Sequence, residues 1–276
     1  MEIPDLYGEL KDNDFQKIGS FIYKNYGINL YPKKKVLLKS RLQKRLKHLG
    51  ISSYSDYRDY LFNNKEEIIH MIDKISTNKT DFFREAVHFE YLEGIIKNGF
   101  ANNLDNNELL VWSAGCSSGQ EAYSLAMTID NLKSEIGYKY RIFASDISLS
   151  VLKTAKEAIY PFNLLNQIPL VFRKKYLLKS KDKTNPRFRI VKELRDNTEF
   201  SFYNLLSKDA FSKLKFNIIF CRNTLIYFDT ETQIKVMHNL IRHLKKGGLL
   251  FLGHSESIIN MGLPLETVHP SVYEKK

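Results

Sequence analysis

The stretch LLVWSAGCSSGQEAYSLAMTI, residues 109–129, contains an apolar run, a cluster of small residues and an amphipathic helix pattern in that order. The apolar run 109–112 has the composition of a buried parallel strand. Apolar residues then recur at helical spacing, which predicts a helix that packs one face on the sheet: Ala122, Leu125, Ala126 and Ile129. The small residues between strand and helix would let a ligand approach the backbone, as in a nucleotide-type cofactor site.

A second apolar run, 142–144, ends in Ser145 and Asp146, about thirty residues after the small-residue loop. An acidic side chain at the tip of the second strand suits a ribose with two free hydroxyls, because a carboxylate accepts both hydrogen bonds. The loop lacks the G-x-G-x-x-G spacing of a dinucleotide fold. Taken alone, it is also compatible with a tight connection from strand to helix.

The composition indicates a globular protein of ordinary type, with 276 residues, 43% of them hydrophobic and 26% charged. This length accommodates one large α/β domain and a smaller one. The N-terminus MEIPDLYGELKDND has no apolar signal region, and no run approaches the roughly eighteen apolar residues of a membrane span. We therefore expect a cytoplasmic protein without direct membrane insertion.

The two cysteines, Cys116 and Cys221, are too few for a disulfide framework and lack zinc-site spacing. No metal is expected. Both cysteines fall at predicted strand ends, where they are either ligand contacts or small core residues.

The formal net charge is +11, and the basic residues are concentrated in two segments. The segment 33–48 contains eight Lys and Arg residues, no acidic residue, and leucines at helical spacing, which predicts a basic amphipathic helix. The segment 173–195 contains ten basic residues against Asp182 and Glu193. An anionic partner is therefore plausible.

The pattern of elements divides the chain into an all-helical N-terminal domain, residues 1–76, and an α/β domain, residues 77–276. In the first, we expect helices around Phe15–Ile22, over the basic segment, after a cap at Ser53 or Ser55, and from Asn64 onward. In the second, a helix over 81–98 precedes strands at 109–112, 142–144, 200–203, 216–220 and 249–252. Strands that alternate with helices predict a doubly wound, mostly parallel sheet.

The alternation is interrupted at about 160–197, where 176–178 and 188–191 predict an antiparallel hairpin inserted at the flank of the sheet. Polar residues also follow the strand 216–220, namely Cys221, Arg222 and Asn223, with Tyr227 one helical turn beyond. Ligands of open α/β sheets bind at such carboxyl ends. A capped polar loop would have the same composition.

Six ordered motifs resemble the CheR family, the chemotaxis receptor protein-glutamate O-methyltransferases, over nearly the whole chain. They are TNKTDFFRE (77–85), VWSAGCSSGQEAYSLA (111–126), FASDIS (143–148), NLL (204–206), FCRNTLIYFD (220–229) and GGLLFLGHSES (247–257). The resemblance implies S-adenosylmethionine as methyl donor and glutamate side chains of chemotaxis receptors as acceptors. The products would be the glutamate methyl ester and S-adenosylhomocysteine.

The resemblance also assigns site residues by position. The matched cofactor contacts are Asn78, Thr80, Arg84, Glu121, Asp146, Asn204, Leu205, Cys221, Arg222 and Asn223. The positions proposed to serve catalysis are Arg84 and Tyr227, although a core tyrosine on the helix after the strand is an alternative for Tyr227. Arg84 would hold a carboxylate, either that of the acceptor or that of the cofactor.

A site without a general base agrees with this reaction. A glutamate carboxylate, with a pKa of about 4.3, is already ionised at neutral pH and needs no proton acceptor. Alignment of the reacting atoms is then the enzyme's main task.

The basic helix would attract the glutamate-bearing receptor helices through Lys39, Arg41, Lys44 and Arg45, unless it is only a solvated face. In some members of the resembled family the inserted subdomain adds a receptor C-terminal peptide as an extra strand, and those members carry a glycine-containing turn there. The turn here, 179–186, has no glycine, which leaves that function open. We expect a monomer.

Two rival interpretations are a nucleic-acid methyltransferase and a non-catalytic cofactor-binding adaptor. The basic charge fits the first. However, CRNTLIYF lacks the Pro-Pro-Tyr/Phe tip that accepts a flipped base, so no nucleic-acid partner is expected. The presence of Arg84 and Asp146 argues against the adaptor.

Overall fold

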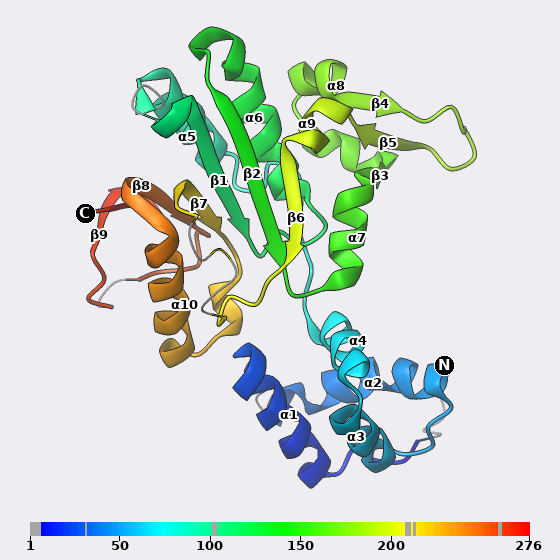
Figure 1. Ribbon diagram of the computed structural model, residues 1–276. Coiled ribbons are helices and arrows are strands. Elements are labelled where there is room, and N and C mark those ends of the chain that lie inside the picture. The colour runs from blue at the N-terminus through cyan, green and yellow to red at the C-terminus, as the bar shows by residue number, and fades with distance from the viewer. Residues whose placement is uncertain (1–6, 31, 101–103, 208–210, 212–213, 259–260) are drawn as a thin grey trace.

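The computed structural model describes residues 7–30, 32–100, 104–207, 211, 214–258 and 261–276. A helical unit at the N-terminus lies below the carboxyl ends of the strands of an α/β unit, and a small second sheet projects from the flank (Figure 1). The predicted fold class, a mostly parallel sheet with an N-terminal helical part and an inserted antiparallel β-subdomain, is therefore confirmed.

The N-terminal unit consists of α1 (Asp12–Tyr26), α2 (Lys35–Leu49), α3 (Tyr54–Asn63) and α4 (Lys65–Ile75). Ser53, not Ser55, caps α3, because its hydroxyl accepts a hydrogen bond from the backbone amide of Asp56. The side-chain oxygen of Asn64 accepts hydrogen bonds from the backbone amides of Glu66 and Glu67 at the start of α4. Gly27 and Gly50 end α1 and α2 in the left-handed region that favours glycine. One apolar cluster joins the four helices, and it includes Ile18, Ile22, Leu38, Leu42, Leu46, Tyr57, Leu61 and Ile72.

The helix predicted over 81–98 is shorter than expected, because α5 spans only Val87–Lys97. Phe83 and Glu85 have φ values of 51° and 56°, which an α-helix does not allow. The amides of Phe82 and Phe83 bond to the side chains of Gln167 and Ser124 instead of helical carbonyls. Residues 81–86 therefore form a turn whose shape depends on other parts of the chain.

The main sheet has the order β6-β2-β1-β7-β8-β10-β9. Its parallel strands are β1 (Glu108–Ala114), β2 (Lys139–Asp146), β6 (Thr198–Phe202), β7 (Phe216–Cys221) and β8 (Leu244–Leu252). These correspond to the five predicted strands. Two antiparallel edge strands, β9 (Leu265–His269) and β10 (Val272–Lys275), were not predicted; β9 lacks an alternating buried face.

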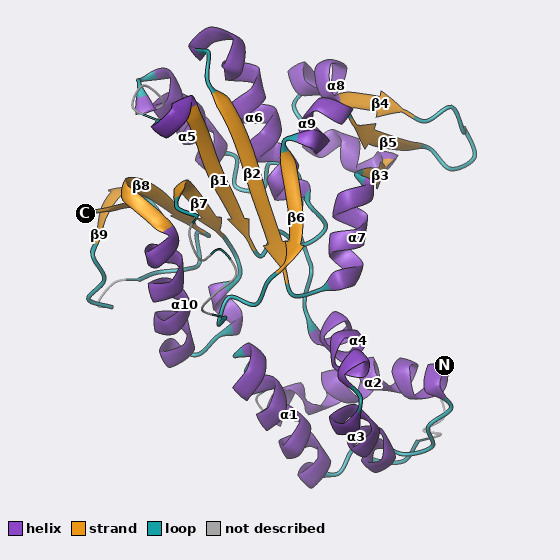
Figure 2. Cartoon of the chain, viewed as in Figure 1, coloured by secondary structure: helices purple, strands orange, loops and turns teal. Residues whose placement is uncertain are grey.

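Helices cover both faces of the main sheet (Figure 2). Val111 of β1 points toward α5 and α6 (Gln120–Ile136), while the next residue, Trp112, packs on α10 (Thr230–His243). This alternation is the period of two expected for a strand buried on both faces. Helix α7 (Leu149–Glu157) follows β2 and packs on the same face as α6.

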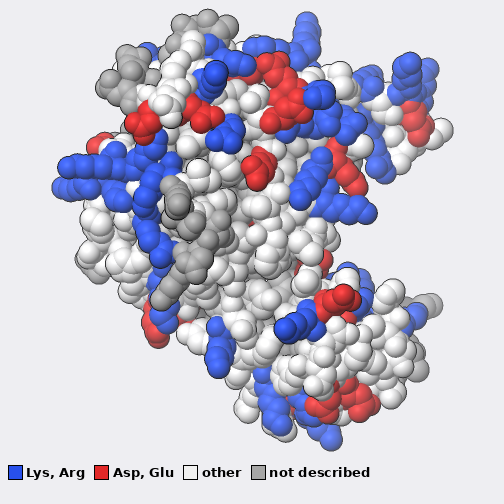
Figure 3. Space-filling model, in the orientation of Figure 1, with Lys and Arg blue, Asp and Glu red and all other residues white. Residues whose placement is uncertain are grey.

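The inserted β-subdomain is a three-stranded antiparallel sheet with the order β3 (Ile159–Pro161), β5 (Arg187–Ile190) and β4 (Leu177–Lys179). The predicted hairpin is β4-β5, except that Tyr176 ends the preceding helix α8 (Leu170–Tyr176); β3 was not predicted. A 3₁₀ helix, η4 (Phe162–Gln167), and helix α9 (Lys192–Asp196) complete the insert. Lys and Arg side chains gather on the exposed β4-β5 turn (Figure 3).

Within the described ranges, no helix combines the length and the apolar character that crossing a membrane requires.

Candidate functional site

A cavity opens where the carboxyl ends of β1, β2 and β7 face the N-terminal unit. The strand order reverses direction between β1 and β7, which is where open α/β sheets bind ligands. Both units and the segment that joins them contribute to the wall. The N-terminal contribution comes from Tyr26, Ile28, Leu30, Lys34 and Leu37. Nine of the ten cofactor-binding residues predicted from the sequence line this cavity, together with Tyr227.

Asp146 ends β2, and the residue is only 9% exposed. Its two carboxylate oxygens accept the amides of Ser117, at 2.9 Å, and Ser148, at 3.0 Å. Burial raises the pKa of the Asp146 carboxyl, although these amide hydrogen bonds act in the opposite direction. Each oxygen keeps a further lone pair, so the carboxylate can still accept two hydroxyl groups of a ligand.

The small-residue loop runs close to its neighbours, which explains its composition. A Cβ on Gly115, whose φ is 85°, would lie 2.5 Å from Oγ1 of Thr224. The Ser117 hydroxyl donates to the backbone oxygen of Asn78 at 3.0 Å. The loop after β1 is therefore fastened to the segment that joins the two units.

Arg222 is a buried cation at the tip of β7, and its side chain is 1% exposed. Its Nη2 lies 2.9 Å from Oε2 of Glu85, and its Nη1 lies 3.4 Å from Oε2 of Glu121. Nη2 also donates to the backbone oxygen of Arg84, and the guanidinium lies over the ring of Phe89. Although Arg222 lines the cavity, most of its bonding capacity therefore serves to hold the turn that carries Arg84.

Glu121, in the first turn of α6, was predicted as a cofactor contact and lies in the cavity wall. It accepts a hydrogen bond from the Ser113 hydroxyl at 2.8 Å. Burial raises the pKa of Glu121, and the charge of Arg222 opposes that shift.

Glu256 supports the loop after β7 and was not singled out from the sequence. Its carboxylate accepts the backbone amides of Asn223 (2.8 Å), Leu225 (2.7 Å), Ile226 (3.3 Å) and Gly253 (2.7 Å). Asn223 itself has a φ of 54° and donates to Glu85 at 3.3 Å. The available signal for Glu256 was its place in the motif GGLLFLGHSES, which does not show what an acidic residue there would bind.

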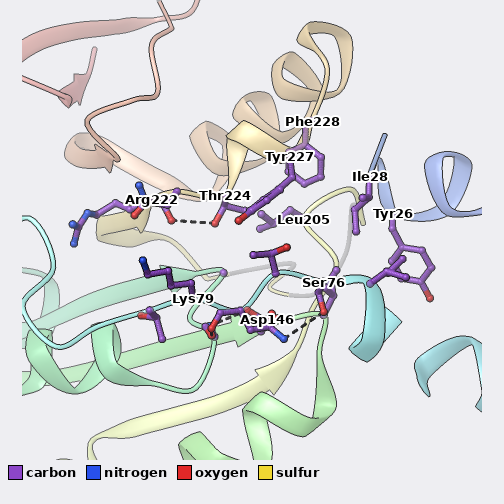
Figure 4. A pocket seen from close by; sticks show the side chains of 18 of the residues that line it. Tyr26, Ile28, Ser76, Lys79, Asp146, Leu205, Arg222, Thr224, Tyr227 and Phe228 are labelled. Carbon is purple, nitrogen blue, oxygen red and sulfur yellow. Dashed lines mark hydrogen bonds between the residues drawn. The ribbon is translucent and has the colours of Figure 1, made fainter. Parts of the chain in front are cut away.

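Tyr227 belongs to the 3₁₀ helix η5 (Leu225–Tyr227) that this loop forms. Its side chain is half-buried and lines the cavity, so it is not a core tyrosine. Figure 4 places Tyr227 beside Thr224 and across the cavity from Asp146. Its hydroxyl can therefore meet a group bound in the cavity.

Three of the predicted contacts come from the segment between the two units. Asn78 donates to the hydroxyls of Ser76 and Ser148 at 3.4 and 3.5 Å, and Thr80 lies in the same wall. Arg84 is half-buried at the cavity and donates from Nη1 to the backbone oxygen of Lys79 at 3.3 Å.

Asn204 and Leu205, which follow β6, form the opposite wall. The Asn204 amide donates to the backbone oxygen of Asn25 at 2.7 Å. Nearby, the hydroxyl of Tyr23 donates to Asp229 at 2.7 Å. Hydrogen bonds thus join the C-terminal end of α1 to the rim of the cavity.

Family comparisons agree with this geometry. Residues 13–76 match the all-alpha domain of CheR methyltransferases, and residues 78–272 match their SAM-binding domain. This chain belongs to the CheR methyltransferase family. The chemotaxis protein methyltransferase of Borreliella burgdorferi is 39% identical over 95% of this chain and 94% of its own length. That of Escherichia coli is 34% identical over 91% and 87%. Chemotaxis protein methyltransferase 2 of Pseudomonas aeruginosa is 34% identical over 94% and 92%.

One predicted cofactor contact of this CheR chain does not reach the cavity. Cys221 is fully buried and packs between the sheet and α10, with Trp112 and Leu240 in the same cluster. Side chains alternate along β7, so Phe220 packs in the cluster on the α5 and α6 face and Cys221 packs in the cluster on the α10 face. Cys116 is also buried, and burial raises the pKa of both thiols. The interpretation of the cysteines as core residues is therefore correct for their side chains.

The cations of the basic helix α2 are not all exposed, and two of the four predicted receptor-binding residues bond within the N-terminal unit. Arg41 donates to the backbone oxygens of Ile75 and Ser76, at the end of α4. Arg45 forms an ion pair with buried Glu67. Lys39 is half-buried, and only Lys44 of the four predicted receptor-binding residues is exposed. Arg41 and Arg45 are therefore structural residues of the N-terminal unit.

Among the described residues, Glu85, His88 and His254 form a group whose spacing could hold a metal ion. Arg222, however, already lies 2.9 Å from the Glu85 oxygen that faces both histidines. A dication there would meet a buried guanidinium, so the electrostatics oppose metal binding.

Proposed function

We propose that this protein transfers the methyl group of S-adenosylmethionine to glutamate side chains of chemotaxis receptors. The products are the glutamate methyl ester and S-adenosylhomocysteine. The single observation that best supports the proposal is the cavity at the strand-order reversal, with Asp146 on one side and Tyr227 on the other. The names of the curated relatives support the assignment to chemotaxis.

The residues present fit S-adenosylmethionine, which supplies a sulfonium methyl group when bound. Asp146 is a buried carboxylate with free lone pairs at the strand tip, as ribose hydroxyls require. Asn78, Thr80, Glu121 and Asn204 add polar atoms to the same wall.

The chain's own task in the reaction is orientation. An acceptor glutamate is ionised at neutral pH, so no residue has to remove a proton. Tyr227 would donate one hydrogen bond to the acceptor carboxylate, and Arg84 would pair with a carboxylate at the cavity mouth. Fixing such groups in line contributes up to about 7–11 kcal/mol in well-organised cases.

Several broader properties belong to the same proposal. We infer that the reaction needs no metal and that the protein acts as a cytoplasmic monomer with domains 1–76 and 77–276. Methyl transfer that is unchanged by EDTA would support a reaction without a metal. Light scattering that gives the mass of one chain, with and without cofactor, would support a monomer.

The direct test incubates the purified protein with methyl-labelled S-adenosylmethionine and receptor-containing membranes. Base-labile label on the receptor, reduced in Asp146→Ala, is the expected result. Label that resists base, or that is transferred to added DNA or RNA instead, would contradict receptor glutamate methylation.

A further inference from the structure

The turn before Arg84 is bonded to the inserted β-subdomain through one side chain, Gln167. Gln167 is the last residue of η4. Its Oε1 accepts the backbone amide of Phe82 at 2.9 Å, and its Nε2 donates to Oδ1 of Asp81 at 2.7 Å. One amide group therefore satisfies both the main chain and a side chain of the residues that lead into Arg84.

Aromatic contacts join the same two parts of the chain. The ring of Phe82 meets that of Tyr160 edge-on at 5.0 Å, and Phe82 is only 2% exposed. The ring of Phe83 stacks on Phe172 of α8 at 5.3 Å. Both residues that precede Arg84 are thus packed against the insert.

The turn needs such support because its backbone is strained. Phe83 and Glu85, on either side of Arg84, have positive φ values of 51° and 56°. Bulky residues keep this conformation only when surrounding contacts impose it. The contacts come from three directions: Gln167 in the insert, Ser124 in α6, and Arg222 at the tip of β7.

We propose that Gln167 is a positioning residue for Arg84, and that the inserted β-subdomain forms part of the support of the catalytic site. This inference rests on the proposed function, because it assumes that Arg84 acts on a carboxylate in the reaction. Gln167 does not line the cavity, so any effect on turnover has to pass through the turn.

The first experiment compares Gln167→Ala with Asn163→Ala, which removes an exposed amide from the same 3₁₀ helix. We measure kcat, the KM for receptor and the Kd of S-adenosylhomocysteine. Arg84→Ala is measured in parallel and shows which of these three constants depends on Arg84. Gln167→Ala should change the same constant in the same direction, by about 5- to 20-fold, as expected for one or two lost hydrogen bonds. Asn163→Ala should leave all three unchanged.

The second experiment is a double-mutant cycle with Arg84→Ala. If Gln167 acts through Arg84, Gln167→Ala should have little further effect once Arg84 is absent. Fully additive effects would overturn the inference while leaving the proposed function intact. If Arg84→Ala itself leaves turnover and binding unchanged, the assignment of Arg84 fails, and the positioning role of Gln167 fails with it.

An exchange variant separates positioning from loss of folding. Gln167→Glu still accepts the Phe82 amide but places a carboxylate against Asp81, so turnover should fall. Adding Asp81→Asn restores a donor–acceptor pair with the direction reversed, and turnover should recover relative to Gln167→Glu. No recovery in a double variant with the wild-type melting temperature would contradict the positioning role.

Discussion

The guanidinium of Arg45 binds the carboxylate of Glu67 in a two-pronged contact, with Nε 2.8 Å from Oε1 and Nη2 2.6 Å from Oε2. The side chain of Glu67 is 1% exposed, and Tyr57 donates to Oε1 as well. The contact joins α2 to α4 across the core of the N-terminal unit.

Arg45→Ala should therefore destabilise the protein by up to about 3–5 kcal/mol, because it leaves a buried carboxylate without its cation. Urea unfolding would measure this. Lys44→Ala, at the exposed neighbouring position, should stay within about 0.5 kcal/mol of wild type. A similar free energy of unfolding for both variants would place Arg45 on the solvated face.

Receptor attraction should depend on the exposed cations of α2 instead. Lys44→Glu is expected to slow methylation at low receptor concentration, because association of opposite charges is mainly an effect on encounter rate. Wild-type rates should also fall as salt is raised, since exposed charges are largely screened beyond a Debye length of roughly 8 Å at physiological ionic strength, and this length shortens as salt is added. Lys246→Glu, exposed at the amino end of the sheet, is the matched control. Equal initial rates in the two variants at every salt concentration would exclude α2.

Asp146→Ala should weaken S-adenosylhomocysteine binding by about 1–3 kcal/mol, the cost of leaving ribose hydroxyls without an acceptor in a partly dry site. Titration calorimetry measures the dissociation constant. Asp146→Asn retains one acceptor oxygen and should give a smaller loss. Wild-type affinity in a folded Asp146→Ala protein would remove this residue from the cofactor site.

Tyr227→Phe should lower kcat while the affinity for S-adenosylhomocysteine stays near wild type, because the lost hydroxyl orients only the acceptor. Initial-rate kinetics combined with calorimetry would show the split. A parallel loss of turnover and affinity would make Tyr227 a cofactor contact.

The buried side chain of His88 should lower the free energy of unfolding in mild acid. Burial, followed by the charge of Arg222, lowers the pKa of His88 from 6.5 to about 4. Between these pH values the unfolded chain binds a proton that the folded protein does not, so stability falls as pH drops through this window. His88→Phe should reduce that slope, measured as the free energy of urea unfolding between pH 7 and 4.5. Identical slopes in wild type and variant would show that folding does not lower the pKa of His88.

The sequence predicts the parallel sheet well because β1, β7 and the core of β8 contain apolar runs of four residues and β2 contains a shorter one. The edge strand β9 has no such run, since most of its side chains are exposed. The turn at Phe83 and Glu85 was missed for another reason. Its conformation is imposed by Gln167, Ser124 and Arg222, which are distant in sequence.

The position of a residue at the cavity was predictable where it follows from the residue's place on a strand, as for Asp146 at the end of β2. The position of a long side chain was less predictable. Arg41 and Arg45 lie three residues after Leu38 and Leu42, at the border of the buried stripe of α2, and a count of charges does not reveal that they turn inward. Cys221 shows the same limit, because its position at a strand tip does not reveal which face it occupies.

The segment 75–81, which joins the helical unit to the sheet, is also a wall of the cavity. Exchange of N-terminal units between related methyltransferases is therefore constrained in where the crossover can fall. A junction before Ile75 would keep this segment with the sheet, although the cavity lining from α1 to α2, which includes Tyr26 and Leu37, would still come from the other parent. A junction between Asn78 and Asp81 would divide the segment as well. In chimeras of this architecture, the crossover has to be chosen so that residues 75–81 of the cavity wall stay together, and the position of the apparent linker is a poor guide to it.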